Sequence, residues 1–259
     1  NYFKTSKVYW LENISEETAK KFSERQPKPK NSILLLDSCQ PSVCKIVLSK
    51  ADHIQRVELK NLNPAATETV GKILAKTDIK SVLLSNLNQL AAKNCIKHLA
   101  GSKVTSLWVD NLNMGNEAFV YTPTFQGYYL NMINVDVNTA RWIASGFTGS
   151  TFHNLTLKNI NAAATRCIVK QFSQCHAKRL DIDNLTVDAM KVVCDQLPNT
   201  KFVTIMLSNL SVASAKYLIS KLPFMKECTL SSRSGLSSDV LALFGEYFGK
   251  NAKRNLVNN

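Results

Sequence analysis

Val82-Leu83-Leu84-Ser85-Asn86-Leu87-Asn88 is the stretch that decides the fold, because closely similar stretches lie on both sides of it. Val57-Glu58-Leu59-Lys60-Asn61-Leu62-Asn63 begins 25 residues earlier, and Leu107-Trp108-Val109-Asp110-Asn111-Leu112-Asn113 begins 25 residues later. Each reads as a short strand with alternating apolar residues, followed by a turn at Asn, a residue that tolerates turn conformations. A repeat of this length predicts an array of similar structural units.

The pattern extends over nearly the whole chain. We call its first residue position zero. The ten residues expected at position zero are Tyr9, Leu34, Val57, Val82, Leu107, Tyr128, Leu155, Leu180, Ile205 and Cys228. Position two is aliphatic in all ten units, position five is apolar in nine, and position four is Asn in seven. Because side chains alternate along a strand, positions zero and two are expected to face the core together.

The second half of each unit has helical spacing. Ala92, Cys95, Ile96 and Leu99 fall on one face of a helix after the strand at Val82. A short strand and one helix cannot bury their apolar faces alone, but stacked units can. The sequence therefore predicts an α/β repeat protein of about ten strand–helix units.

The ends are expected to act as caps of a single domain, 1–259. An N-terminal capping unit spans 8–30, central repeats span 31–227, a C-terminal capping unit spans 228–250, and 251–259 forms a flexible tail. Ser15 is the expected N-cap of the first helix, and the last helix is expected to begin near Ser237 or Ser238. The first residue, Asn1, suggests a fragment or a processed form.

Bulk composition restricts the class of protein. No run of about 18 apolar residues occurs, so no membrane-spanning helix is expected. The seven cysteines are odd in number and scattered, which predicts free thiols, several of them in the core. Free thiols indicate a reducing, cytoplasmic compartment, either of the producing cell or of a host cell into which the protein is delivered. The chain has no CxxC pair, HExxH, GxSxG or Gly-rich phosphate loop. We therefore expect no metal site, no cofactor and no catalytic residues.

The repeated L-x-L-x-N-L strand with a helical second half, over about residues 8–248, resembles the leucine-rich repeat family, and its ribonuclease-inhibitor-like subclass in particular. This resemblance implies a solenoid curved like a horseshoe, with a parallel sheet on its concave side that binds another protein. It also suggests an effector or a sensor. The sequence departs from the family at position five, where the family usually has Asn or Cys and this chain has Leu or Ile in most units. An apolar plug is the expected replacement.

Residues one and three steps after position zero are expected on the concave face. Leu83, Trp108 and Tyr129 would lie on adjacent strands as an apolar cluster. The expected partner-binding set is completed by the residues that flank this cluster: Lys60, Asp110 and Asn131. The sequence thus predicts a non-catalytic scaffold for protein–protein interaction. The alternative is that these side chains pack on each other or lie under a loop. Glu58, Asp181 and Asp183 are interpreted as a solvated face.

Two further features leave alternatives open. The net charge is +13, and the excess of Lys and Arg falls mostly on the predicted helices. A solvated basic exterior is favoured, and binding of RNA, DNA or anionic lipid is the alternative. The stretch from Met114 to Gly127 replaces a helix; its aromatic residues either pack in the core or form a partner-binding loop. A third functional reading is a substrate-recognition segment of a longer enzyme.

Overall fold

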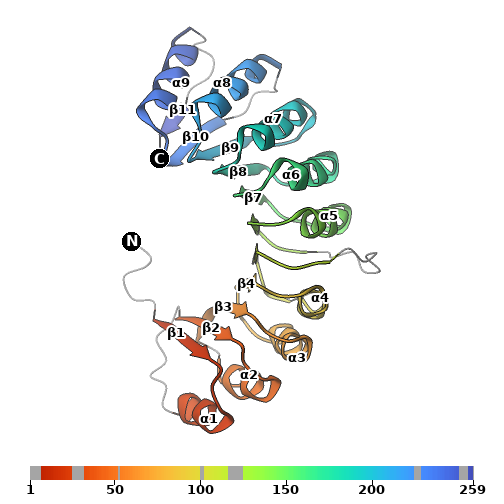
Figure 1. Ribbon diagram of the computed structural model, residues 1–259. Helices are drawn as coiled ribbons and strands as arrows, with labels where there is room; N and C mark the ends of the chain where they lie inside the picture. Colours follow the sequence, from red (N-terminus) through yellow and green to blue (C-terminus); the bar gives the residue numbers. More distant parts are fainter. Residues whose placement is uncertain are drawn as a thin grey trace. The chain divides into compact units, whose positions relative to one another are not determined.

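The computed structural model describes residues 7–24, 32–51, 53–99, 102–115, 125–224, 229–250 and 256–258. Strands and helices alternate along the chain, and neighbouring strands pair in parallel (Figure 1). The residues group into two compact units, Asn1–Gly127 and Tyr128–Asn259. The predicted α/β repeat architecture is thereby confirmed within each unit.

The first unit contains five strands and four helices in its described residues, and the helices lie together on one face of the sheet (Figure 1). Its strands are β1 (Val8–Glu12), β2 (Ser32–Asp37), β3 (Ile54–Lys60), β4 (Ser81–Ser85) and β5 (Ser106–Asp110). Its helices are α1 (Glu16–Glu24), α2 (Pro41–Leu48), α3 (Pro64–Leu74) and α4 (Gln89–Ile96).

The second unit repeats this arrangement with a short 3-10 turn after each of its first four helices. Its strands are β6 (Tyr129–Ile133), β7 (Asn154–Lys158), β8 (Arg179–Asp183), β9 (Thr204–Ser208), β10 (Thr229–Ser234) and β11 (Leu256–Asn258). Its helices are α5 (Val137–Ser145), α6 (Ala162–Val169), α7 (Val187–Gln196), α8 (Val212–Lys221) and α9 (Ser238–Lys250). Strand β11 pairs with β10, although it lies in the stretch expected to be a tail.

The core contains the residues that the repeat places there. Val82 and Leu84 are fully buried, and so are the helix residues Ala92 and Cys95. The apolar residues of position five are buried as well: Leu62, Leu87, Leu112, Ile160, Leu185 and Leu210. In the described residues no helix is both long and apolar enough to cross a membrane.

Most of the described cysteines lie in this core. Six of them are free thiols and five of those are buried; Cys228 lies outside the described residues. Burial raises the pKa of the Cys44, Cys95 and Cys194 thiols to about 12. The prediction that several cysteines act as small core hydrophobes is confirmed.

Two of the strand–helix repeats have a different register from the predicted one. Leu130 pairs with Leu155, and Leu230 pairs with Ile205, so Leu130 and Leu230 occupy position zero instead of Tyr128 and Cys228. Tyr128, expected in the core, is 48% exposed. A shift of two residues leaves every side chain on the same face of the strand, so alternation alone did not distinguish the two registers.

The turn residue at position four distinguishes the correct register from the predicted one. In the described part of the chain, nine residues at position four have a left-handed backbone with φ between 45° and 54°. Asn adopts this conformation more readily than most residues. Eight of the nine are Asn and one is Ser38: Asn13, Ser38, Asn61, Asn86, Asn111, Asn134, Asn159, Asn184 and Asn209. The prediction of a turn at Asn is confirmed, and the register correction adds Asn134 to the set.

The side chains of these turn residues also form hydrogen bonds with one another. Asn159 Nδ2 donates to Asn134 Oδ1 at 3.0 Å, and Asn184 Nδ2 donates to Asn159 Oδ1 at 2.8 Å. In the first unit, Asn111 Nδ2 donates to Asn86 Oδ1 at 2.7 Å. The apolar plug at position five is therefore accompanied by an exposed asparagine ladder at position four.

Two positions further on, a polar side chain starts the helix. Asn63, Asn88 and Asn161 each accept a hydrogen bond from the backbone N–H three residues later, and Ser15 does the same for Thr18 as predicted. Such N-caps satisfy donors that the first helical turn leaves open. The repeated motif is thus L-x-L-x-N-L followed by a capping residue.

Candidate functional site

The strand face is the side of each sheet opposite the helices, and positions one and three lie on it. In the first unit, Leu83 pairs in register with Trp108, which confirms that these two predicted residues are neighbours. Lys60 and Asp110 flank them, each paired with Ser85. Tyr129 belongs to the second unit, so its alignment with Trp108 stays a prediction.

The Trp108 ring is held in place by its neighbours. Its Nε1 donates to Ser106 Oγ at 2.9 Å, and the Arg56 guanidinium lies over the ring, 5.1 Å from its centroid. Arg56 also forms an ion pair with Glu58, Nε to Oε1, at 2.9 Å. Trp108 is half-buried as a result, and its remaining surface is presented in a fixed orientation.

The most exposed apolar side chains of this face are ones that the predicted set omitted. Val8 and Trp10 on β1 are 62% and 61% exposed, and they pair with the half-buried Ile33 and Leu35 on β2. Trp10 stands at position one, so the repeat did place it on this face, but exposure is not readable from the pattern. We call Val8, Trp10, Ile33, Leu35, Leu83 and Trp108 the apolar strand face.

Position three carries charges that are paired within the fold. Lys60 Nζ lies 3.2 Å from Asp37 Oδ2, and Asp37 Oδ1 accepts from Asn61 Nδ2 at 2.8 Å and from Ser38 Oγ at 2.9 Å. Burial acts to raise the pKa of Asp37, but these hydrogen bonds and the Lys60 charge outweigh it and lower the pKa. Lys60 thus flanks the apolar strand face as predicted, with its charge largely compensated.

The second unit has similar ion pairs at its strand residues. Lys158 Nζ lies 2.8 Å from Asp183 Oδ2, and Asn209 Nδ2 donates to Asp183 Oδ1 at 2.7 Å. The Arg179 guanidinium donates two hydrogen bonds to the Asp181 carboxylate, of 2.6 Å and 3.0 Å. The acidic residues that the sequence suggested as a solvated face are thus held in ion pairs.

The two remaining predicted residues differ in exposure. Tyr129 is exposed, and its ring meets that of Tyr128 edge-on at 4.7 Å between centroids. Asn131 was expected at position three on an accessible face, but its side chain is only 4% exposed and its Nδ2 has no hydrogen-bond partner among the described residues. The register correction moves Asn131 to position one, in the middle of a strand beside Thr156, where most side chains of this unit are buried.

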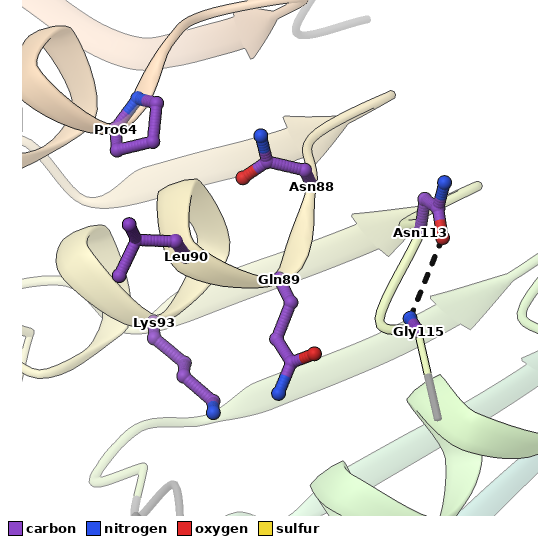
Figure 2. Close-up of a pocket in the computed structure, with 7 residues that line it drawn as sticks. All are labelled: Pro64, Asn88, Gln89, Leu90, Lys93, Asn113 and Gly115. Carbon is purple, nitrogen blue, oxygen red and sulfur yellow. Dashed lines mark hydrogen bonds between the residues drawn. The ribbon is translucent and has the colours of Figure 1, made fainter. Parts of the chain in front are cut away.

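A surface pocket of about 430 Å³ lies beside the N-terminus of α4 in the first unit (Figure 2). Its lining residues are Pro64, Asn88, Gln89, Leu90, Lys93, Asn113 and Gly115. Asn88 caps α4, and the Gln89 amide, once its N and O are exchanged to face complementary groups, donates to the Met114 carbonyl and accepts from Lys93 Nζ at 2.8 Å. The polar side chains of the pocket thus already serve the fold.

Most of the irregular stretch beside this pocket lies outside the described residues. Phe119 and Tyr121 fall there. Phe125 is described and is buried, which agrees with the core reading for that ring.

The helix side of the first unit carries a compensated charge cluster around Glu68. Its carboxylate lies 2.6 Å from Lys97 Nζ, 3.0 Å from Lys72 Nζ and 3.1 Å from His98 Nε2. The hydrogen bond from Lys97 is the main cause that lowers the pKa of Glu68 to about 2, with Lys72 and His98 adding to it.

This cluster predicts a pH dependence of stability. Glu68 has a lower pKa in the folded chain than in the unfolded one, so its contribution is complete above about pH 5 and is lost as the pH falls toward 2. Glu68→Gln should therefore lower the free energy of unfolding at pH 7 by roughly 1–2 kcal/mol, because the carboxylate is still partly solvated. Urea titrations of both proteins should converge near pH 2–3. A constant difference over this range would contradict the assignment.

Two features of the described residues bear on catalytic or metal chemistry. In the described ranges, no group of three or more His, Cys, Asp or Glu side chains could hold a metal ion. Cys175 is buried, and burial raises the pKa of its thiol to about 11, while the neighbouring His176 is exposed. Comparison of the chain with protein-family models and with curated proteins finds no match.

Proposed function

We propose that this chain is a leucine-rich-repeat-type scaffold that binds a protein partner through the apolar strand face of its first unit. The observation that carries this proposal is the exposure of Trp10 and Val8, both above 60%, on the same sheet face as Leu83 and Trp108. The Arg56–Glu58 ion pair of β3 lies between the apolar residues of β1–β2 and those of β4–β5. Apolar side chains exposed on one face typically mark interaction sites.

The repeat itself supports the family part of the proposal. Parallel strands with buried positions zero and two, a turn, and a helix on one side of the sheet are what the resemblance implies. The asparagine ladder at position four and the apolar residues at position five are this chain's own variation. Cys39 is an exception at position five, and its thiol donates to the Leu11 carbonyl at 3.3 Å as a polar residue would.

The composition of the face favours a protein over a small molecule. Trp and Arg are enriched among residues that dominate the energy of protein interfaces. Arg56 and Ser106 hold Trp108 in position before any partner arrives, so little side-chain entropy is lost on binding. The ion-paired row beside it, with Lys60 and Asp37, supplies a polar rim.

The test compares two variants of this face with an exposed aromatic elsewhere. Trp10→Ala and Trp108→Ala should each weaken the complex by about 2 kcal/mol or more, which is roughly 30-fold in Kd. Phe224→Ala is the matched control, because Phe224 is 73% exposed in the second unit. Proteins captured by the wild-type chain from a cell lysate would be identified, and their affinities measured by calorimetry with purified components.

Two results would contradict the proposal. One is a captured partner that binds both Trp variants as tightly as it binds wild type. The other is a loss of affinity for Trp108→Ala that is matched by a large fall in thermal stability, which would return that ring to a structural role. Trp10 has no such ambiguity because most of its side chain is in solvent.

A further inference from the structure

A row of basic side chains runs along the helices of the second unit at position eleven. Arg141, Arg166, Lys191 and Lys216 are each 25 residues apart, on α5, α6, α7 and α8. All four are exposed, as is Lys170, which caps the C-terminus of α6. These helices pack against each other in chain order, so the five side chains lie on neighbouring elements. We call these five residues the basic row.

Its charges are mostly uncompensated. Among the described residues, Arg141, Arg166, Lys170 and Lys216 form no ion pair, and only Lys191 has one, with Asp188 at 3.4 Å. The sequence between Asp136 and Asp181 contains no Asp or Glu at all, but six Lys and Arg residues. In the first unit position eleven is Lys20, Lys45, Glu68 and Lys93, so Glu68 with its own cations interrupts the basic residues there. Only the second unit has a basic residue at position eleven on four successive helices.

The surroundings of the row are small and polar. The exposed side chains on α5–α8 other than the basic row are Ser145, Ala163, Asp188, Asp195, Gln196, Ala213 and Ser220. None is aromatic or a large aliphatic residue. The Tyr217 ring on α8 is half-buried, lies beside Lys221 and donates its hydroxyl to Asp195, so it is held by its neighbours and does not offer a free face to a stacking base. These four helices expose no large apolar side chain that could enter a bilayer beneath anionic headgroups.

The spacing suits a linear polyanion. Packed helices lie about 8–10 Å apart, so four of them carry the row over roughly 25–30 Å. Duplex nucleic acid rises about 3.4 Å per base pair, which makes this length about eight base pairs with a regular line of phosphates. We propose that the basic row binds the phosphate backbone of a nucleic-acid duplex without reading its sequence. This proposal is independent of the strand-face function.

The experiment measures fluorescence anisotropy of labelled 20-base-pair duplexes of mixed sequence, DNA and RNA in separate arms, with the whole chain. With about four phosphate contacts, affinity should fall with salt with a log–log slope near −3.6, or roughly 100-fold between 50 and 200 mM. Replacing Arg141, Arg166, Lys170 and Lys216 by Gln should weaken binding at least tenfold and remove most of the slope.

A second quadruple variant provides the matched control. Lys7, Lys50, Lys76 and Lys80 are exposed lysines of the first unit that lie outside position eleven, and their replacement by Gln changes the net charge by the same amount. It should leave the affinity within about twofold, because only placement differs. All eight sites are exposed, so both variants should keep the wild-type melting temperature.

A gain of affinity gives an independent check. Asp188→Asn removes the carboxylate beside Lys191 and should tighten duplex binding by about two- to fivefold. Three results would overturn the proposal: no salt-sensitive duplex binding by the wild-type chain, equal losses in the two quadruple variants, or binding to phosphatidylserine vesicles in the absence of duplex binding.

Discussion

Leu84→Asp is expected to unfold the first unit. Leu84 has no exposed surface and lies on β4 between Leu59 and Val109, its register partners on β3 and β5. The change removes a buried leucine, which alone costs about 2–5 kcal/mol, and adds a carboxylate with no partner. The total should exceed about 4 kcal/mol, a large part of the stability of a typical domain. Urea denaturation followed by circular dichroism measures the loss.

The neighbouring residue supplies the control. Leu83 lies on the same strand but on the opposite face, and it is half-buried. Leu83→Asp should cost only about 1 kcal/mol, even though Glu58 is its register partner on β3. Equal losses for the two variants would mean that the strand faces are assigned wrongly. A one-residue difference in sequence thus becomes a large difference in stability, because alternation sends adjacent side chains to opposite sides.

Asn159→Val should produce the next largest loss of stability, about 3 kcal/mol. Asn159 has φ of 52°, and its side chain both donates to Asn134 and accepts from Asn184. A β-branched residue in the left-handed region costs about 1–2 kcal/mol, and each lost hydrogen bond adds about 0.5–1.5 kcal/mol. The melting temperature and the urea midpoint of the purified chain report the change.

Asn159→Gly separates the two causes. Glycine adopts the left-handed conformation without strain but cannot form the ladder, so this variant should lose only about half as much stability. The ladder contributes little if the glycine variant is as stable as wild type, and backbone strain contributes little if the valine variant is no worse than the glycine variant.

The unit around Leu130 shows how far a pattern can be followed. Tyr128-Tyr129-Leu130-Asn131-Met132 offers apolar residues in alternation at either of two registers. The choice between them depends on Asn134, which takes the left-handed turn, and on the pairing of Leu130 with Leu155. Alternation therefore predicts which face of the strand a residue lies on, but it does not predict the residue's position along the strand. Asn131 was placed on the correct face, but its burial was not foreseen.

The helix caps were a readable signal that the initial pattern did not include. A residue that can cap recurs at position six, from Ser15 and Asn63 to Ser211. Extending the motif by one residue beyond position five would have located most helix starts. Propensities of this kind are local, so one sequence suffices to read them.

The sequence by itself determined the repeat, the two faces of each strand, and the Asn turns, because strand alternation and left-handed turns depend on residues close together in the chain. Only the tertiary structure decided which side chains remain available. Arg56 on β3 reaches past β4 to Trp108 on β5, and Lys97 at the end of α4 reaches Glu68 on the adjacent α3. Trp10 and the basic row stay in solvent instead. Ion pairs and ring contacts join residues that are tens of positions apart, and no repeat pattern states which of them will meet.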